Sequence, residues 1–66
     1  MRKINITNAK NAIDTMERRK NFYIKNGWQL KDSDEFSCVL ERTNRAGYIV
    51  EVQIMVDDNI CYECNL

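Results

Sequence analysis

The chain has 66 residues, with ten Lys and Arg balanced by ten Asp and Glu, no His and no Pro. A chain this short buries only about 60% of its unfolded surface, so we predict one small domain over residues 1–66 without an enclosed substrate cavity. Because the sequence has no His, no glycine-rich phosphate loop and no Ser/His/Asp set, we predict no catalytic residues, no cofactor and no enzyme activity.

The sequence also predicts a cytoplasmic location. The stretch after Lys3 contains two Asn and a Thr, which does not fit a signal peptide, and no segment is apolar enough to cross a bilayer. The three cysteines, an odd number, indicate free thiols. Cys61 and Cys64 have C-x-x-C spacing but lack the further ligands of a zinc site and the helix start of a redox motif. We therefore predict structural thiols and no metal.

In chain order, residues 3–6 alternate polar and apolar, which predicts a short edge strand. A helix follows from about Asn8 to Asn26, with Thr7 or Asn8 as its N-cap. Gly27 supplies the left-handed residue that ends the helix. The apolar stripe of this helix consists of Ala9, Ala12, Ile13, Met16, Tyr23 and Ile24.

After Gly27 the apolar period changes to two, which predicts four antiparallel strands connected as a meander. The expected fold class is α+β with two layers, one N-terminal helix packed on this four-stranded sheet, with an extra short N-terminal edge strand. The core face of the sheet is predicted to consist of Trp28, Leu30, Phe36, Cys38, Leu40, Tyr48, Val50, Val52, Ile54, Val56, Ile60, Tyr62 and Cys64.

Two turns define the predicted register. Residues 45–47 fit a three-residue loop with Gly47 in the left-handed conformation, and residues 57–59 fit another with Asn59 there. These loops keep even-numbered residues opposite one another. Ile54 is then expected opposite Tyr62, and Met55 opposite Cys61.

Charge is distributed unevenly along the chain. Residues 1–31 contain eight basic and two acidic side chains, whereas residues 32–66 contain eight acidic and two basic ones. In a meander, the turn after the first strand and the turn before the last lie at the same end of the sheet. Five carboxylates are therefore expected together at this end, and we call them the acidic pole: Asp32, Asp34, Glu35, Asp57 and Asp58. At the opposite end of the sheet we expect Arg45, Lys25 and either Arg18 or Arg19.

The odd-numbered strand residues are expected on the uncovered face of the sheet. They mix apolar side chains with acids, and a flat face of this kind is typical of a protein-binding surface. We therefore assign partner binding to the acidic pole together with Glu41, Glu51, Met55 and Ile49.

These observations favour a small non-enzymatic protein-binding module. Clustered carboxylates can stand in for phosphates, so we expect it to block a basic partner protein that handles nucleic acid. Eight Asn and seven Ile without Pro indicate an AT-rich genome. The expectation is a phage or mobile-element inhibitor of the anti-defence or anti-CRISPR type, acting in a bacterial or phage-infected host cell.

Two alternatives stay open. Nucleic acid could bind the basic helix face through Lys10, Arg18, Asn21 and Lys25, although the zero net charge and the acidic pole oppose this. The chain could also form a homodimer through the open sheet face or an edge strand.

Overall fold

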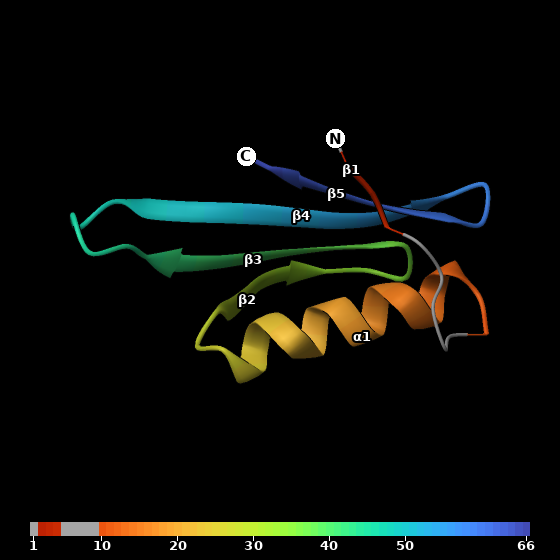
Figure 1. Cartoon of the computed structure of the whole chain (residues 1–66), viewed down its shortest axis with the longest axis horizontal. Helices are drawn as coiled ribbons and strands as arrows, with labels where there is room; N and C mark the ends of the chain where they lie inside the picture. The colour runs from red at the N-terminus through yellow and green to blue at the C-terminus, as the bar shows by residue number, and fades with distance from the viewer. Residues whose placement is uncertain (1, 5–9) are drawn as a thin grey trace.

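The computed structural model describes residues 2–4 and 10–66, and shows one helix packed on a five-stranded antiparallel sheet (Figure 1). The strand order is β1-β5-β4-β3-β2, which confirms the two-layer α+β fold, the meander and the edge strand. The helix within the described residues is too short and too polar to span a membrane. The elements are β1 (Arg2–Ile4), α1 (Ala12–Lys25), β2 (Gln29–Ser33), β3 (Ser37–Thr43), β4 (Ile49–Asp57) and β5 (Ile60–Asn65).

Helix α1 starts later than the sequence predicted. The expected caps Thr7 and Asn8 lie outside the described residues, and the N-cap is Asn11, whose Oδ1 accepts a hydrogen bond from the Asp14 backbone N–H at 2.9 Å. The other end of the helix is confirmed, because Gly27 follows the last turn with a φ of +94°.

The β3–β4 hairpin has the predicted register. Leu40 pairs with Val52 and Cys38 with Ile54. Gly47 closes the loop of residues 45–47 with a φ of +88°. The alternation of the two strands and the glycine position therefore agree on one pairing.

The predicted register of β5 is wrong by one residue. Asp58 and Asn59 both have positive φ, at 51° and 56°, and form a two-residue turn in which Asp57 pairs with Ile60. Ile54 consequently lies opposite Glu63 and not Tyr62. Because a shift of one residue exchanges the two faces of a strand, Cys61 and Glu63 face the helix and Tyr62 and Cys64 face away from it.

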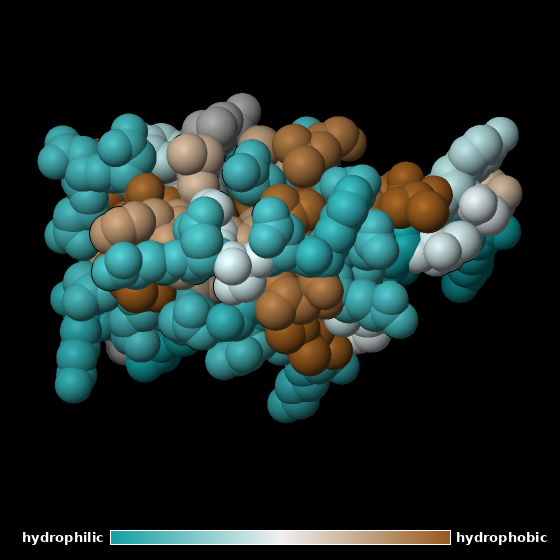
Figure 2. Space-filling model, turned by 180° about the vertical axis from the view of Figure 1, so that it is seen from behind, coloured by the Kyte–Doolittle hydropathy of each residue, from teal (hydrophilic) through white to brown (hydrophobic). Residues whose placement is uncertain are grey.

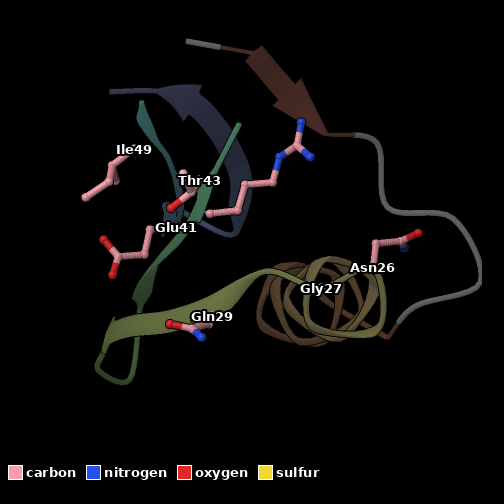
Figure 3. A pocket seen from close by; sticks show the side chains of 7 residues that line it. Asn26, Gly27, Gln29, Glu41, Thr43 and Ile49 are labelled. Atoms are coloured by element: carbon pink, nitrogen blue, oxygen red, sulfur yellow. The ribbon is translucent and has the colours of Figure 1, made fainter. Parts of the chain in front are cut away.

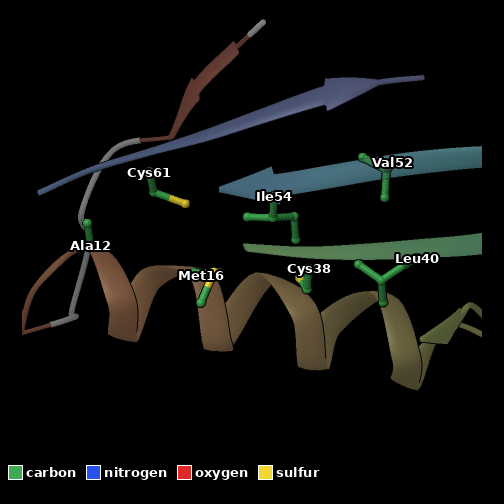
Figure 4. Close-up of a cluster of buried hydrophobic side chains, with 7 residues drawn as sticks. All are labelled: Ala12, Met16, Cys38, Leu40, Val52, Ile54 and Cys61. Carbon is green, nitrogen blue, oxygen red and sulfur yellow. The ribbon is translucent and has the colours of Figure 1, made fainter. Parts of the chain in front are cut away.

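The core lies between α1 and strands β3, β4 and β5 (Figure 4). Tyr23 and Trp28 are half-buried at its border, with their ring centroids 4.9 Å apart in an edge-to-face arrangement. The buried apolar residues are Ala12, Met16, Cys38, Leu40, Val52, Ile54 and Cys61.

Three residues predicted for the core face of the sheet are exposed, and so are Ile13 and Ile24 of the predicted helix stripe, so the core is smaller than expected. Leu30 lies on the edge strand β2, Phe36 lies in the β2–β3 turn, and Tyr48, which is 71% exposed, lies in the β3–β4 turn beyond the end of α1 (Figure 1). Tyr48 thus lies past the last turn of α1, whereas Leu30 is exposed because β2 is the outermost strand.

The shifted register makes a prediction for thiol reactivity. Cys64 is expected to react with a thiol reagent in the native state, whereas Cys38 and Cys61 should react about 100-fold more slowly, through opening of the fold. Burial also raises the pKa of the Cys38 and Cys61 thiols, which lowers their thiolate fractions. Timed alkylation with mass-spectrometric site assignment measures the three rates. Fast labelling of Cys61 with protection of Cys64 would instead support the register predicted from the sequence, with Ile54 opposite Tyr62.

Candidate functional site

The acidic pole forms at one end of the sheet. The Val56 backbone N–H donates to the Phe36 carbonyl at 2.7 Å, which brings the β2–β3 turn beside the β4–β5 turn. All members of the pole are exposed, and none is in an ion pair with a described residue. The two turns and the strand ends beside them therefore present five solvated carboxylates, from Asp32, Asp34, Glu35, Asp57 and Asp58.

Asp34 also holds its own turn in shape. Its Oδ1 accepts hydrogen bonds from the backbone N–H groups of Phe36 and Ser37, both at 2.9 Å, and from the Ser37 hydroxyl at 3.2 Å. The Phe36 N–H is the main cause that lowers the pKa of Asp34, with the Ser37 hydrogen bonds adding to it. This carboxylate is therefore ionised at neutral pH.

The N-terminus of α1 lies beside the pole. The Ala12 backbone N–H donates to Asn59 Oδ1 at 3.1 Å, which ties the first turn of the helix to the β4–β5 turn. The positive end of a helix dipole stabilises nearby anions. The same contact thus fixes the turn and reduces the repulsion among its carboxylates.

The acids outside the pole are mostly paired. Asp14 contacts Arg18 at 3.3 Å, Glu17 contacts Lys20 at 2.7 Å, and Glu51 contacts Lys31 at 3.0 Å. Exposed basic side chains gather at the other end, where Lys25 ends α1 and Arg45 lies in the β3–β4 turn. The molecule is 37 Å long, and Lys25 and Arg45 lie at the end opposite the acidic pole, whereas the exposed Lys10 precedes α1 beside the pole.

The outer face of the sheet, which faces away from α1, contains the remaining predicted binding residues. Ile49 is 65% exposed, and Glu41, Glu51 and Met55 are half-buried. Tyr62 occupies the place opposite Met55 that the sequence analysis gave to Cys61. Figure 2 shows the molecule from behind the view of Figure 1, and on this side apolar groups (brown) are separated by hydrophilic side chains (teal).

A buried charge cluster was missed by the sequence analysis. Glu63 is 7% exposed, and its Oε2 accepts hydrogen bonds at 2.8 Å from both the Arg2 guanidinium and the Tyr23 hydroxyl. Arg19 binds both carboxylate oxygens, at 3.2 and 3.3 Å. Burial raises the pKa of Glu63, but the hydrogen bonds from Arg19 and Tyr23 outweigh it and the pKa is lowered overall. Arg19 is therefore part of this cluster and not of the basic end.

Two clefts of the described structure lie away from the acidic pole. The first, of about 270 Å³, lies between the end of α1 and β3, and its charged lining residues are Glu41 and Arg42 (Figure 3). The second, of about 310 Å³, adjoins Glu63, whose oxygens are already hydrogen-bonded. Within residues 2–4 and 10–66, no three His, Cys, Asp or Glu side chains are placed to hold a metal ion.

The alternative nucleic-acid-binding residues are all exposed. Arg18, Asn21 and Lys25 lie on the solvent face of α1, and Lys10 precedes it. Asp14 lies between them and accepts hydrogen bonds from the Lys10 backbone N–H and the Arg18 side chain. The Asp14 carboxylate therefore reduces the positive potential of this helix face.

The chain matches no protein-family model, no curated protein and no solved structure. Its function has to be inferred from the chemistry of its own surfaces.

Proposed function

We propose that this chain is a non-enzymatic protein-binding module that docks the acidic pole onto a basic surface of a partner protein. The observation that carries the proposal is the set of five exposed carboxylates on two adjoining turns and the strand ends beside them, unpaired with any described residue. Exposed charges at one end of a molecule steer association with an oppositely charged partner.

The proposed partner handles nucleic acid. A channel that binds a phosphate backbone is lined with Lys and Arg, and closely spaced carboxylates compete for the same side chains. We propose a phage or mobile-element inhibitor of the anti-defence or anti-CRISPR type, which occupies such a channel in the bacterial cytoplasm. A rigid pole supports this role, because Asp34 and Asn59 hold the two turns by hydrogen bonds.

Nucleic-acid binding through the face of α1 is the second candidate. The exposure of Arg18, Asn21 and Lys25 on one side of the helix favours it. The Asp14 carboxylate within the same face and the five free carboxylates at the end of the molecule oppose it.

The proposal is tested by neutralising the pole. A variant with Asp32, Asp34, Asp57 and Asp58 all changed to Asn is expected to associate with the partner about tenfold more slowly at low salt, with a flatter salt dependence. Asn keeps the acceptor oxygen of Asp34 and tolerates the positive φ of Asp58. The partner is captured from host lysate with and without nuclease, and its association rate is then measured by surface plasmon resonance.

The matched control reverses charge on α1. Arg18→Glu with Lys25→Glu should leave the association rate within about twofold of wild type, because both side chains lie outside the pole. A gel shift with single- or double-stranded nucleic acid at physiological salt, lost on this reversal, would overturn the proposal in favour of the nucleic-acid alternative.

A further inference from the structure

The shifted register organises the outer face into rows of cross-strand neighbours. In the first row, Tyr62 lies between Lys3 and Met55. In the second, Gln53 lies between Cys64 and Val39. Tyr62, Met55, Val39 and Cys64 thus place apolar atoms on adjoining strands in the middle of the face, and all four are half-buried.

Acidic side chains bound this apolar centre at both ends. Asp57 and the rest of the acidic pole lie at one end of β4, and Glu51 lies near the other. Glu41 is directly opposite Glu51 in the β3–β4 register, a like-charge pair that destabilises a sheet. Lys31 forms an ion pair with Glu51 at 3.0 Å, and Glu41 has no ion-pair partner among the described residues. A cation from outside would gain from both carboxylates.

Two other binding modes are disfavoured, one by the charges of the outer face and the other by a bulge in the edge strand β2. A second copy stacked face to face would bring acids together, because the described residues give this face four acidic side chains and two basic ones. A strand added beside β2 would meet the bulge between Leu30 and Asp32, which interrupts that edge. The charged residues of the face are Asp32, Glu41, Glu51, Asp57, Lys3 and Lys31.

We propose that the outer face binds a basic amphipathic helix of the partner, laid along β4, with apolar side chains on Tyr62 and Met55 and Lys or Arg at both ends. This inference rests on the proposed function for the basic character of the partner. Asp57 and Glu51 are six residues apart in β4, which is about 20 Å in a strand. A helix covers that distance in about 13 residues. Tyr and Met at the centre of a charged face are typical of interface anchors.

A synthetic probe tests the inference directly. The probe is a stapled helical peptide of about 13 residues with Arg at both ends and Leu and Trp in the middle. The control peptide has the same composition with Arg in the middle and the apolar residues at the ends. Calorimetry at physiological salt is expected to give at least about tenfold tighter binding for the first peptide. Amide shifts of the ¹⁵N-labelled protein should centre on Val39, Met55 and Tyr62.

Matched protein variants identify the anchor. Tyr62→Ser is expected to weaken binding of the first peptide at least about tenfold, whereas Tyr48→Ser, in the exposed β3–β4 turn, should leave it unchanged. Glu41→Gln with Glu51→Gln should weaken it severalfold and reduce its salt dependence. Circular dichroism checks that each variant folds, and Met55→Gln replaces Tyr62→Ser if that variant does not.

Equal binding of the two peptides, no binding, or shifts confined to α1 would overturn the inference. Dimerisation in sedimentation runs that is lost in Tyr62→Ser would also overturn it, in favour of a second copy. The proposed function fails separately, if the pole variant associates with its partner at the wild-type rate. The peptide test does not depend on that result, because it uses a synthetic peptide in place of the partner, and its Tyr62, Glu41 and Glu51 variants keep all pole residues.

Discussion

Leu40→Ala is expected to lower the free energy of unfolding by about 2–4 kcal/mol, a large part of the stability of so small a protein. Leu40 is fully buried, and lies between Leu30 and Val52 in the sheet, beneath α1. Truncation leaves a cavity that rigid strands on both sides cannot fill. Urea denaturation followed by Trp28 fluorescence measures the change.

The control for this experiment is Ile49→Ala. Ile49 is 65% exposed on the outer face, so its truncation should change the free energy of unfolding by less than about 0.5 kcal/mol. A Leu40→Ala protein as stable as wild type would mean that the helix does not cover this face of β3.

Glu63→Gln is the second change with a large expected effect, a loss of about 3 kcal/mol in the free energy of unfolding. The substitution removes the charge that compensates the Arg19 and Arg2 guanidinium groups and weakens the hydrogen bond from Tyr23. Glu51→Gln, which breaks only the more exposed pair with Lys31, should cost less than about 1 kcal/mol.

The same substitution has a pH signature. The pKa of Glu63 is lower in the folded state than in the unfolded chain, so its stabilisation is complete above the ordinary Glu pKa of about 4.3 and is lost as the pH falls through the folded pKa. The stability difference between wild type and Glu63→Gln should therefore shrink below about pH 4. A difference that stays constant down to pH 2 would show that the ionised carboxylate is not what stabilises the fold.

Most of the fold was predictable because several local signals agreed. In β3 and β4, the face toward α1 is the more apolar one, and Gly47 fixes the loop between the strands, so alternation and turn chemistry define the same pairing. At the end of the helix, Gly27 and the change of apolar period after it likewise indicate the same boundary. The acidic pole followed from this topology, since both of its turns lie at one end of any meander of these strands.

The register of β5 was mispredicted because its hydrophobic alternation favours the face that the structure exposes. Ile60, Tyr62 and Cys64 make the more apolar set, and alternation alone favours burying them. The turn decides otherwise, because Asp58 and Asn59 tolerate positive φ and form a two-residue connection. That dipeptide is the signal in the sequence that could have given the correct pairing.

Burial of Glu63 could not be predicted from its own strand. Its hydrogen-bond donors are Arg2 in β1 and Arg19 and Tyr23 in α1. The cost of burying the Glu63 charge is therefore compensated only after β1, α1 and β5 have packed together. From the sequence, Arg19 was considered for the basic end, and Glu63, an odd-numbered residue, was expected on the uncovered face of the sheet. The structure pairs them across the layers.

The position of β1 beside β5 bears on the order of folding. The β3–β4 and β4–β5 pairings are hairpins that close over short loops, whereas Arg2 and Glu63 are 61 residues apart. Loop-closure entropy makes such distant pairings slow to form. We expect β1 to dock only after the meander and helix have assembled, and its amides to exchange hydrogen through local detachment without global unfolding. The salt bridge between Arg2 and Glu63 then forms late in folding and stabilises the assembled sheet without contributing to its nucleation.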